Sequence, residues 1–241
     1  MSKKKCFLFL SIVLLAMAII CGVYLTTGGY QSNVKTASAL LSTADYSVQQ
    51  SADGSMAFVP SNPKAGLIFY PGGKIDSQAY APLMRAFAGE DILCVLLTMP
   101  FDLAIFDVNA ADGIQDRYPE IEKWYLAGHS LGGAMAANYA ANHADEYEGL
   151  FLLASYSVED LTSTDLHVVS LYGSEDRVLN MEQYQKYHSN LPGDAVEVVI
   201  PGGCHAYFGN YGSQDGDGVP TITNEDQIQM TVAQCMSIIE Q

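Results

Sequence analysis

Short apolar runs alternate along the chain with longer segments in which apolar residues recur at helical spacing. The short runs are typical of buried strands and lie at residues 66–70, 92–97, 123–127, 149–154, 168–172 and 195–200. The segments with helical spacing lie at 77–88, 103–118, 131–142, 181–191 and 225–239. Strands that alternate with helices indicate βαβ units, in which a mostly parallel sheet has helices on both faces. The pattern therefore predicts an α/β fold, and two earlier runs at 46–48 and 56–59 predict an opening hairpin.

The N-terminal residues have a different character. Three lysines, at positions 3–5, precede twenty uncharged and mostly apolar residues at 6–25. Twenty residues of helix cover about 30 Å, the thickness of the hydrocarbon core of a bilayer, and the preceding lysines place the N-terminus inside. We predict a signal anchor at 1–25, a linker with opening strands at 26–62, and an extracytoplasmic domain at 63–241. The alternative is a cleaved signal peptide and a secreted domain.

The charge balance is strongly acidic. The 241 residues, a length that suits one domain, include 27 acidic and 11 basic residues, for a formal charge of −16. Affinity for nucleic acid comes largely from Lys and Arg side chains that neutralise phosphates. The composition therefore excludes a nucleic-acid partner, and we expect a monomer whose acidic surface serves solubility.

Three cysteines lie beyond the N-terminal segment. Cys94 belongs to an apolar run and is expected to be buried. Cys204 and Cys235 could pair in an oxidising compartment, which the sequence leaves open. No His/Cys spacing is typical of zinc, and we expect neither a metal nor an organic cofactor.

The most informative string is Gly128-His-Ser-Leu-Gly-Gly133. An apolar run leads directly into it and an alanine-rich helical segment leads directly out. Strand, turn and helix in this order are the context of a nucleophile elbow, in which glycines relieve crowding around a strained serine. This context makes Ser130 the candidate nucleophile.

A serine hydroxyl needs a base, and the base needs an acid to orient it. In enzymes whose nucleophile lies on such an elbow, the acid and the histidine both follow the serine in the chain, and the acid comes first. His205 follows a strand across Pro201-Gly-Gly203, at the sheet edge where catalytic groups collect. Glu175 and Asp176 both follow the preceding strand, and Asp176 is preferred because a Gly-x-x-Asp turn directs it towards the histidine.

The oxyanion hole needs two backbone N–H groups. Leu131, directly after the nucleophile, is one candidate. Gly73, in the first strand-to-helix loop, is the other, with Lys74 close behind it. Tyr207 and Phe208 follow the candidate base and are candidate substrate-binding residues, although ordinary packing explains them equally well.

These strings resemble those of the α/β-hydrolase family 5 group. The resemblance rests on Tyr70-Pro-Gly-Gly-Lys74, Gly128-His-Ser-Leu-Gly-Gly133, Gly173-Ser-Glu-Asp176 and Gly202-Gly-Cys-His-Ala-Tyr-Phe-Gly209 and runs from about Ala65 to the C-terminus. It implies an α/β-hydrolase fold and a triad of Ser130, Asp176 and His205. One departure is Cys204, where similar proteins often have Asn.

The sequence thus predicts a serine hydrolase acting on a small-molecule ester or related acyl compound. An acyltransferase, thioesterase or peptidase would use the same residues, and a surface binding protein with a hydrolase fold is the alternative from another class. The short connection between 154 and 168 leaves no room for a large lid, which predicts an open, shallow site. The acidic string at 212–218 lacks the spacing of an EF-hand and is predicted to be a turn-rich loop.

Overall fold

A computed structural model of the chain describes residue 22 and residues 27–240. Its centre is an eight-stranded sheet in the order β1-β2-β4-β3-β5-β6-β7-β8. β2 is antiparallel to both of its neighbours, and the other contacts between strands from β3 to β8 are parallel. The strands are β1 (Tyr46–Gln50), β2 (Met56–Pro60), β3 (Ala65–Tyr70), β4 (Ile92–Leu96), β5 (Trp124–His129), β6 (Gly149–Leu153), β7 (His167–Gly173) and β8 (Val196–Ile200).

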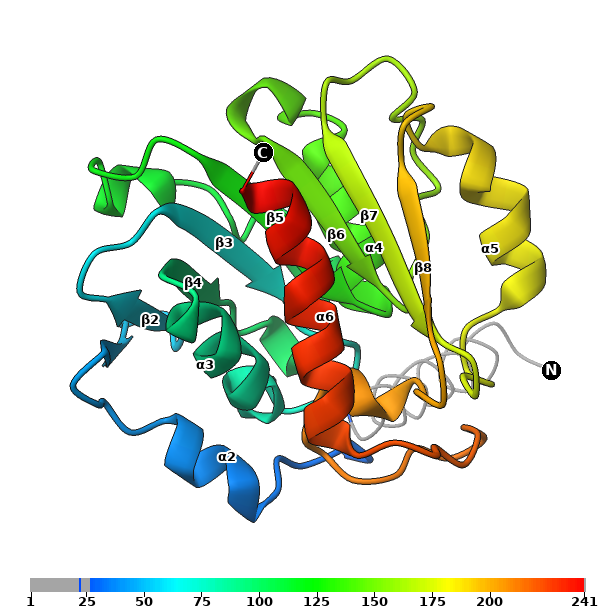
Figure 1. Cartoon of the computed structure of the whole chain (residues 1–241), viewed down its shortest axis with the longest axis horizontal. Coiled ribbons are helices and arrows are strands. Elements are labelled where there is room, and N and C mark those ends of the chain that lie inside the picture. The colour runs from blue at the N-terminus through cyan, green and yellow to red at the C-terminus, as the bar shows by residue number, and fades with distance from the viewer. Residues whose placement is uncertain (1–21, 23–26, 241) are drawn as a thin grey trace, which may run out of the picture.

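Helices cover both faces of this sheet (Figure 1). α3 and α6 pack against each other on the face toward the viewer, with α2 beside α3, while α4 lies behind the sheet. α5 covers the same rear face at β7, where Tyr184 packs against Tyr172. The helices are α2 (Val34–Ala39), α3 (Ala81–Gly89), α4 (Leu131–Ala140), α5 (Met181–Tyr187) and α6 (Asn224–Ile239).

The two faces bury separate apolar cores because successive side chains of a strand point to opposite sides. In β3, Leu67 and Phe69 join the core beneath α3 and α6. Ile68 and Tyr70 join the core that α4 covers. Both faces of the central strands are therefore buried, which is why their sequences are continuous apolar runs rather than alternating ones.

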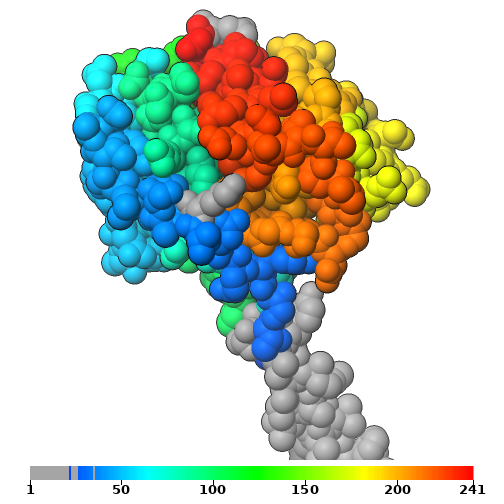
Figure 2. Space-filling model, turned by 60° about the horizontal axis from the view of Figure 1, so that its bottom comes forward, coloured from blue at the N-terminus to red at the C-terminus, as the bar shows by residue number. Residues whose placement is uncertain are grey.

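The parallel strands bring several loops to one edge of the sheet. Tyr70 of β3 pairs with Gly128 of β5, and Gly173 of β7 pairs with Ile200 of β8. The carboxyl ends of these strands point to the lower edge in Figure 1, which faces the viewer in Figure 2. The segments that follow β3, β5, β7 and β8 therefore meet at this edge.

The expectation of a helix over 103–118 was wrong. The structure has two short 3₁₀ turns here, η3 (Ala104–Phe106) and η4 (Gln115–Arg117), and a third, η2 (Pro100–Asp102), directly before them. Asp and Asn side chains compete with helical hydrogen bonds and favour turns, and Asp107, Asn109 and Asp112 supply them here. Gly113, with a φ of 68°, also leaves the helical region. The apolar spacing survives as buried contacts of a folded loop.

Other elements follow the expectation with small changes. The predicted opening hairpin is present as β1 and β2. The segment 77–88 divides into a 3₁₀ turn, η1 (Ser77–Tyr80), and α3. The connection over 154–166 contains only turns and bends, so it forms no lid domain.

Two further expectations concern the N-terminal anchor and a disulfide between Cys204 and Cys235. The predicted signal anchor over 1–25 falls outside the described residues, except for residue 22. In the described part of the chain, every helix is too short or too polar to span a bilayer. Cys94, Cys204 and Cys235 are buried free thiols, so the disulfide considered between the last two is not formed.

Candidate functional site

Ser130 occupies a strained turn between β5 and α4. Its φ of 53° and ψ of −123° are unusual for a residue with a side chain, and it is the N-cap of α4. Its backbone is fixed by two hydrogen bonds: its N–H donates to Leu153 O (2.9 Å), and Ser155 Oγ donates to its carbonyl (2.8 Å). A serine in such a turn projects from the sheet edge and lies at the positive end of the helix dipole.

The glycines of this turn permit close approach of neighbouring backbone. A Cβ on Gly132 would lie 2.3 Å from the carbonyl oxygens of Tyr70 and Pro71. A Cβ on Gly128 would lie 2.6 Å from the backbone of Gly132 and Gly133. Glycine at these positions therefore lets α4 pack directly on the loop that follows β3.

Alanine in place of Gly132 is expected to destabilise the domain by at least about 1–3 kcal/mol, the usual range for overpacking, because the clash is with backbone that cannot rotate away. Thermal or urea unfolding measures this. Gly89→Ala is the matched control, because its new Cβ meets nothing within 4 Å in α3, and it should be neutral or slightly stabilising. Equal stability of the two variants would contradict the close packing of α4.

His205 and Asp176 form a buried pair at the same edge. His205 Nδ1 lies 2.9 Å from Asp176 Oδ2, and their side chains are 2% and 0% exposed. The other oxygen, Oδ1, accepts hydrogen bonds from the N–H groups of Val178 (2.9 Å) and Leu179 (2.8 Å). Because the carboxylate accepts the proton of Nδ1, the lone pair of the ring is on Nε2, the atom that a general base uses.

Glu175, the alternative acid, has a different contact. It accepts a hydrogen bond from Ser174 Oγ (3.1 Å) and is partly exposed. Within the described part of the chain, His205 Nε2 has no hydrogen-bond partner, although it is buried. The geometry therefore selects Asp176 over Glu175 as the residue that orients the histidine.

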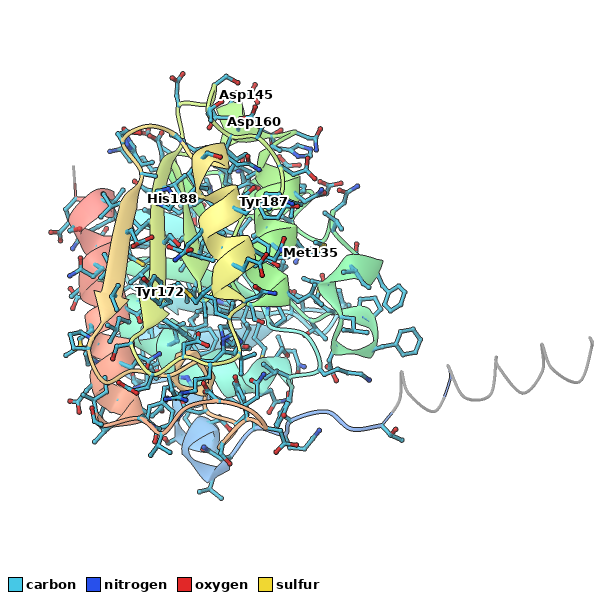
Figure 3. The ribbon with its side chains drawn as sticks, turned by 90° about the vertical axis from the view of Figure 1, so that its right-hand side faces the viewer. Met135, Asp145, Asp160, Tyr172, Tyr187 and His188 are labelled. Atoms are coloured by element: carbon cyan, nitrogen blue, oxygen red, sulfur yellow. The ribbon has the colours of Figure 1, made fainter. Side chains whose placement is uncertain are left out.

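The other histidines beyond the elbow lie elsewhere. His143 donates from Nδ1 to Tyr139 O (2.9 Å) at the end of α4. His188 lies after α5 (Figure 3), with its Nε2 3.6 Å from a carboxylate oxygen of Glu197 and its ring 6.3 Å from that of Tyr184. His167 begins β7, at the opposite end of that strand from the acid loop.

Two residues that the sequence pattern did not single out hold the loop of His205. Gln227 of α6 is fully buried; its Oε1 accepts from Cys204 N–H (3.0 Å) and its Nε2 donates to Cys204 O (2.8 Å). Asp217 Oδ2 accepts from Ala206 N–H (2.9 Å). Both neighbours of His205 in the chain are therefore fixed by buried or partly buried polar side chains.

Asp217 belongs to the acidic string at 212–218, and its other oxygen accepts from Arg177 N–H (3.3 Å), next to the candidate acid. Its carboxylate thus ties two loops of the site together. Burial, and to a smaller extent the charge of Asp217, raises the pKa of the Cys204 thiol to about 12. Among the described residues, no three His, Cys, Asp or Glu side chains are grouped to hold a metal ion.

The loop after β3 offers one unengaged N–H beside the nucleophile. Gly72 N–H donates to Tyr80 Oη (3.1 Å), and Lys74 N–H donates to Asp102 O (2.7 Å). Gly73 N–H, between them, donates to no acceptor in the described part of the chain. A Cβ built on Gly73 would lie 3.3 Å from Leu131 Cβ, so the two predicted oxyanion-hole residues are neighbours.

Leu131 is the first residue of α4, where N–H groups have no acceptor within the helix. The N–H groups of Gly73 and Leu131 are therefore the candidate donors of the oxyanion hole beside Ser130. Lys74, the alternative, is disfavoured because its N–H is already used.

His129, the residue before the nucleophile, is the main feature that the sequence reasoning missed. It is fully buried, and its Nδ1 lies 2.7 Å from Tyr80 Oη. Its ring centroid lies 4.6 Å from that of His205. Its Nε2 has no hydrogen-bond partner among the described residues, although it is buried. Burial, and then the neighbouring His205, holds the pKa of His129 well below its ordinary value.

This burial predicts a pH dependence of stability. Because the pKa of His129 is lower in the folded chain than the ordinary value of about 6.5, the unfolded chain binds the extra proton as the pH falls. The stabilisation that neutral His129 contributes to the free energy of unfolding is therefore complete above about pH 6.5. Below that pH it is lost, by up to about 1.4 kcal/mol per pH unit.

The test compares the wild-type chain with His129→Gln, whose amide carries no proton to titrate. The difference between their unfolding free energies should shrink between pH 8 and pH 5. A difference that is constant over this range would show that His129 is not held neutral. Histidines that do not contact His129 contribute equally to both chains.

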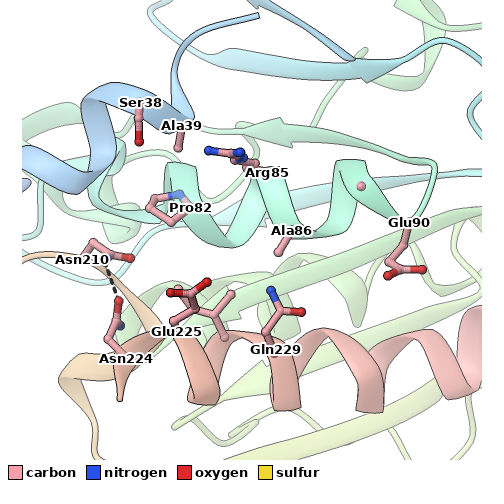
Figure 4. Close-up of a pocket in the computed structure, with 12 residues that line it drawn as sticks. Ser38, Ala39, Pro82, Arg85, Ala86, Glu90, Asn210, Asn224, Glu225 and Gln229 are labelled. Atoms are coloured by element: carbon pink, nitrogen blue, oxygen red, sulfur yellow. Dashed lines mark hydrogen bonds between the residues drawn. The ribbon is translucent and has the colours of Figure 1, made fainter. Parts of the chain in front are cut away.

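The two candidate substrate-binding aromatics are packed inward. Phe208 is 1% exposed, with its ring 5.6 Å from that of His129, and Tyr207 packs partly buried on the same core. The larger described cavity, of about 540 Å³, lies between α2, α3 and α6 and is lined by Arg85, Glu90 and Gln229 among others (Figure 4). Neither these aromatics nor the candidate catalytic residues line it.

The strand order, the serine after β5 and the acid–histidine pair after β7 and β8 define the α/β-hydrolase class of proteins. A model of the alpha/beta hydrolase family matches residues 66–229, more than half of the chain. The chain belongs to this family.

Several solved structures share the fold at low sequence identity. A predicted CIB-like hydrolase from Thermoplasma acidophilum is 15% identical, with a TM-score of 0.57 over 80% of this chain and 99% of that one. Est1E from Butyrivibrio proteoclasticus is 14% identical, with a TM-score of 0.58 over 83% of this chain and 100% of that one. Carboxyl esterase 2 from the mycorrhizal fungus Tuber melanosporum is 9% identical, with a TM-score of 0.60 over 88% of this chain and 92% of that one. Among curated proteins, none matches the chain.

Proposed function

We propose that this chain is a serine hydrolase that cleaves a carboxylic ester or a related acyl compound through an acyl-enzyme on Ser130. The observation that carries the proposal is the strained serine of the elbow together with a buried His205–Asp176 pair, 2.9 Å apart, on loops at the same edge of the sheet. The ester preference is supported by similar structures that are named as carboxylesterases, from Bacillus subtilis and Tuber melanosporum.

In the proposed reaction, Ser130 Oγ attacks the acyl carbonyl while His205 Nε2 takes its proton. Asp176 keeps the proton of His205 on Nδ1 and stabilises the imidazolium that forms. The N–H groups of Gly73 and Leu131 stabilise the oxyanion. The alcohol leaves with the proton from His205, and water then hydrolyses the acyl-enzyme with His205 again as the base.

The neutral His129 contributes to this arrangement. A second positive charge 4.6 Å from the His205 ring would oppose formation of the imidazolium. Because His129 is held neutral, it supports the position of Tyr80 and Gly72 without this penalty.

We also propose that residues 1–25 hold the domain at the outer face of the cell membrane.

A fluorophosphonate probe tests the proposal directly, because it reacts with activated serines. The intact protein should be labelled at the peptide that contains Ser130, as determined by mass spectrometry, and should hydrolyse p-nitrophenyl acetate. Heat-denatured protein is the control and should remain unlabelled. An intact protein that neither reacts with the probe nor cleaves the ester would contradict the proposed function.

A further inference from the structure

Three apolar side chains lie exposed on the segment after β4. Phe101, Ile105 and Phe106, here called the apolar cluster, are 52%, 49% and 51% exposed. The rings of Phe101 and Phe106 are 5.8 Å apart and meet edge to face. A soluble surface seldom groups large apolar side chains in this way, and such groups mark sites that contact a partner or a membrane.

The backbone that presents the apolar cluster is strained. Phe101 and Asp102 are consecutive residues with φ values of 56° and 55°. A bulky residue in this region costs about 1–2 kcal/mol, and such strain persists only where surrounding contacts impose it. One of those contacts is the hydrogen bond from Lys74 N–H to Asp102 O (2.7 Å).

The apolar cluster therefore adjoins the candidate oxyanion hole. Lys74 directly follows Gly73, and a Cβ on Gly73 would lie 3.4 Å from Leu103 Cδ2, between the two halves of the cluster. The apolar cluster is therefore close enough to the candidate site to contact a substrate that extends from it on this side.

The N-terminal segment joins the domain at the same place. Tyr30 N–H donates to Lys74 O (2.7 Å), and Lys74 Nζ donates to Thr27 O (3.3 Å). The ring of Tyr30 also lies 5.5 Å from that of Tyr211, in the loop after His205, with the two rings tilted by 49°. Figure 2 shows the blue N-terminal part of the described chain against the orange part that follows β8.

This position sets how close a bilayer would lie. The apolar run of residues 6–25 ends two residues before Thr27, and two residues of extended chain span at most about 7 Å. A bilayer that holds this run would therefore begin within about 7 Å of Thr27, whose carbonyl accepts a hydrogen bond from Lys74 Nζ beside the apolar cluster. The chain's charge of −16 disfavours anionic lipid, so the contact is apolar.

We propose that the apolar cluster of Phe101, Ile105 and Phe106 docks on the zwitterionic lipid surface and that the site draws its substrate, a long-chain acyl amphiphile, from that surface. The substrate class rests on the proposed hydrolase activity, whereas the docking rests only on the proposed membrane anchor.

Docking is tested with the full chain reconstituted in phosphatidylcholine vesicles. The chain has one tryptophan, Trp124, which is 3% exposed. In Phe106→Trp, brominated phosphatidylcholine should quench most of the added emission. Met230→Trp is the matched control, since Met230 is 41% exposed on α6, and its added emission should not be quenched. Equal quenching of the added emission in Phe106→Trp and Met230→Trp would overturn the docking. An absence of quenching in Phe106→Trp would also overturn it, and would favour a protein partner for the apolar cluster.

The substrate class is tested by a ratio of rates on the same vesicles: hydrolysis of a bilayer-borne long-chain ester over hydrolysis of soluble p-nitrophenyl acetate. In the double variant Phe101→Ser/Phe106→Ser this ratio should fall about tenfold, equivalent to about 1.4 kcal/mol. In Met230→Ser it should not change. An unchanged ratio in the double variant would overturn the lipid substrate.

The two measurements separate this inference from the proposed function. Quenching in Phe106→Trp without ester hydrolysis in the wild-type chain would reject the hydrolase and its substrate and keep the docking. Hydrolysis of soluble ester without quenching would keep the hydrolase and reject the docking.

Discussion

Replacement of Ser130 by alanine is expected to lower kcat for p-nitrophenyl acetate by at least about 10⁴-fold, as loss of a nucleophile does in serine hydrolases. In the proposed reaction this hydroxyl is the group that forms the acyl-enzyme. Hydrogen bonds at this residue involve its backbone, through Leu153 O and Ser155 Oγ. The variant should therefore unfold at nearly the wild-type temperature, and fluorophosphonate labelling should disappear.

Ser155→Ala is the matched control for this experiment. Ser155 is a buried serine that donates to the carbonyl of Ser130 at 2.8 Å, so its loss should slow the reaction modestly through the shape of the elbow. Labelling should persist in this variant. If Ser130→Ala retained wild-type turnover, or if labelling followed Ser155 instead, the nucleophile assignment would be wrong.

Replacement of Asp176 by asparagine is expected to lower kcat by about 10³–10⁴-fold, the scale known for the equivalent change in a serine protease. The reason is the tautomer of His205. An asparagine can keep one oxygen toward the N–H groups of Val178 and Leu179, which turns its NH₂ group toward His205 Nδ1. That nitrogen must then accept, the ring proton moves to Nε2, and the base is lost.

The neighbouring carboxylate supplies the control. Glu175→Gln removes a charge of the same sign one residue away, while Glu175 contacts Ser174 Oγ rather than His205. Its kcat should stay within a fewfold of wild type, and thermal unfolding of both variants shows whether each is folded. A larger loss in Glu175→Gln than in Asp176→Asn would transfer the role of the acid to Glu175.

Much of the arrangement follows from local patterns. The apolar runs predicted the strands because both faces of a central parallel strand are buried, and the glycines around Ser130 predicted the elbow because a side chain there would meet backbone. The same reasoning failed over 103–118, where apolar spacing suited a helix. The Asp and Asn residues between the apolar positions, together with Gly113, favoured turns, and their combined effect outweighed the spacing.

The sequence left other choices open because they depend on contacts between distant residues. Glu175 and Asp176 are adjacent, and the fold turns Asp176 to His205. Gly73 and Lys74 are also adjacent, and the hydrogen bond of Lys74 to Asp102 leaves the Gly73 N–H unengaged.

The amino-acid sequence by itself determined the class of fold, the turn that bears Ser130 and the order in which acid and histidine follow it, because burial of strands and steric crowding of glycines act over a few residues. Only the tertiary structure decided how these parts are supported. Tyr80 reaches His129 across 49 positions, Gln227 reaches Cys204 across 23, and Thr27 reaches Lys74 across 47. Such contacts form when parallel strands bring separate loops to one sheet edge, and no local pattern encodes them.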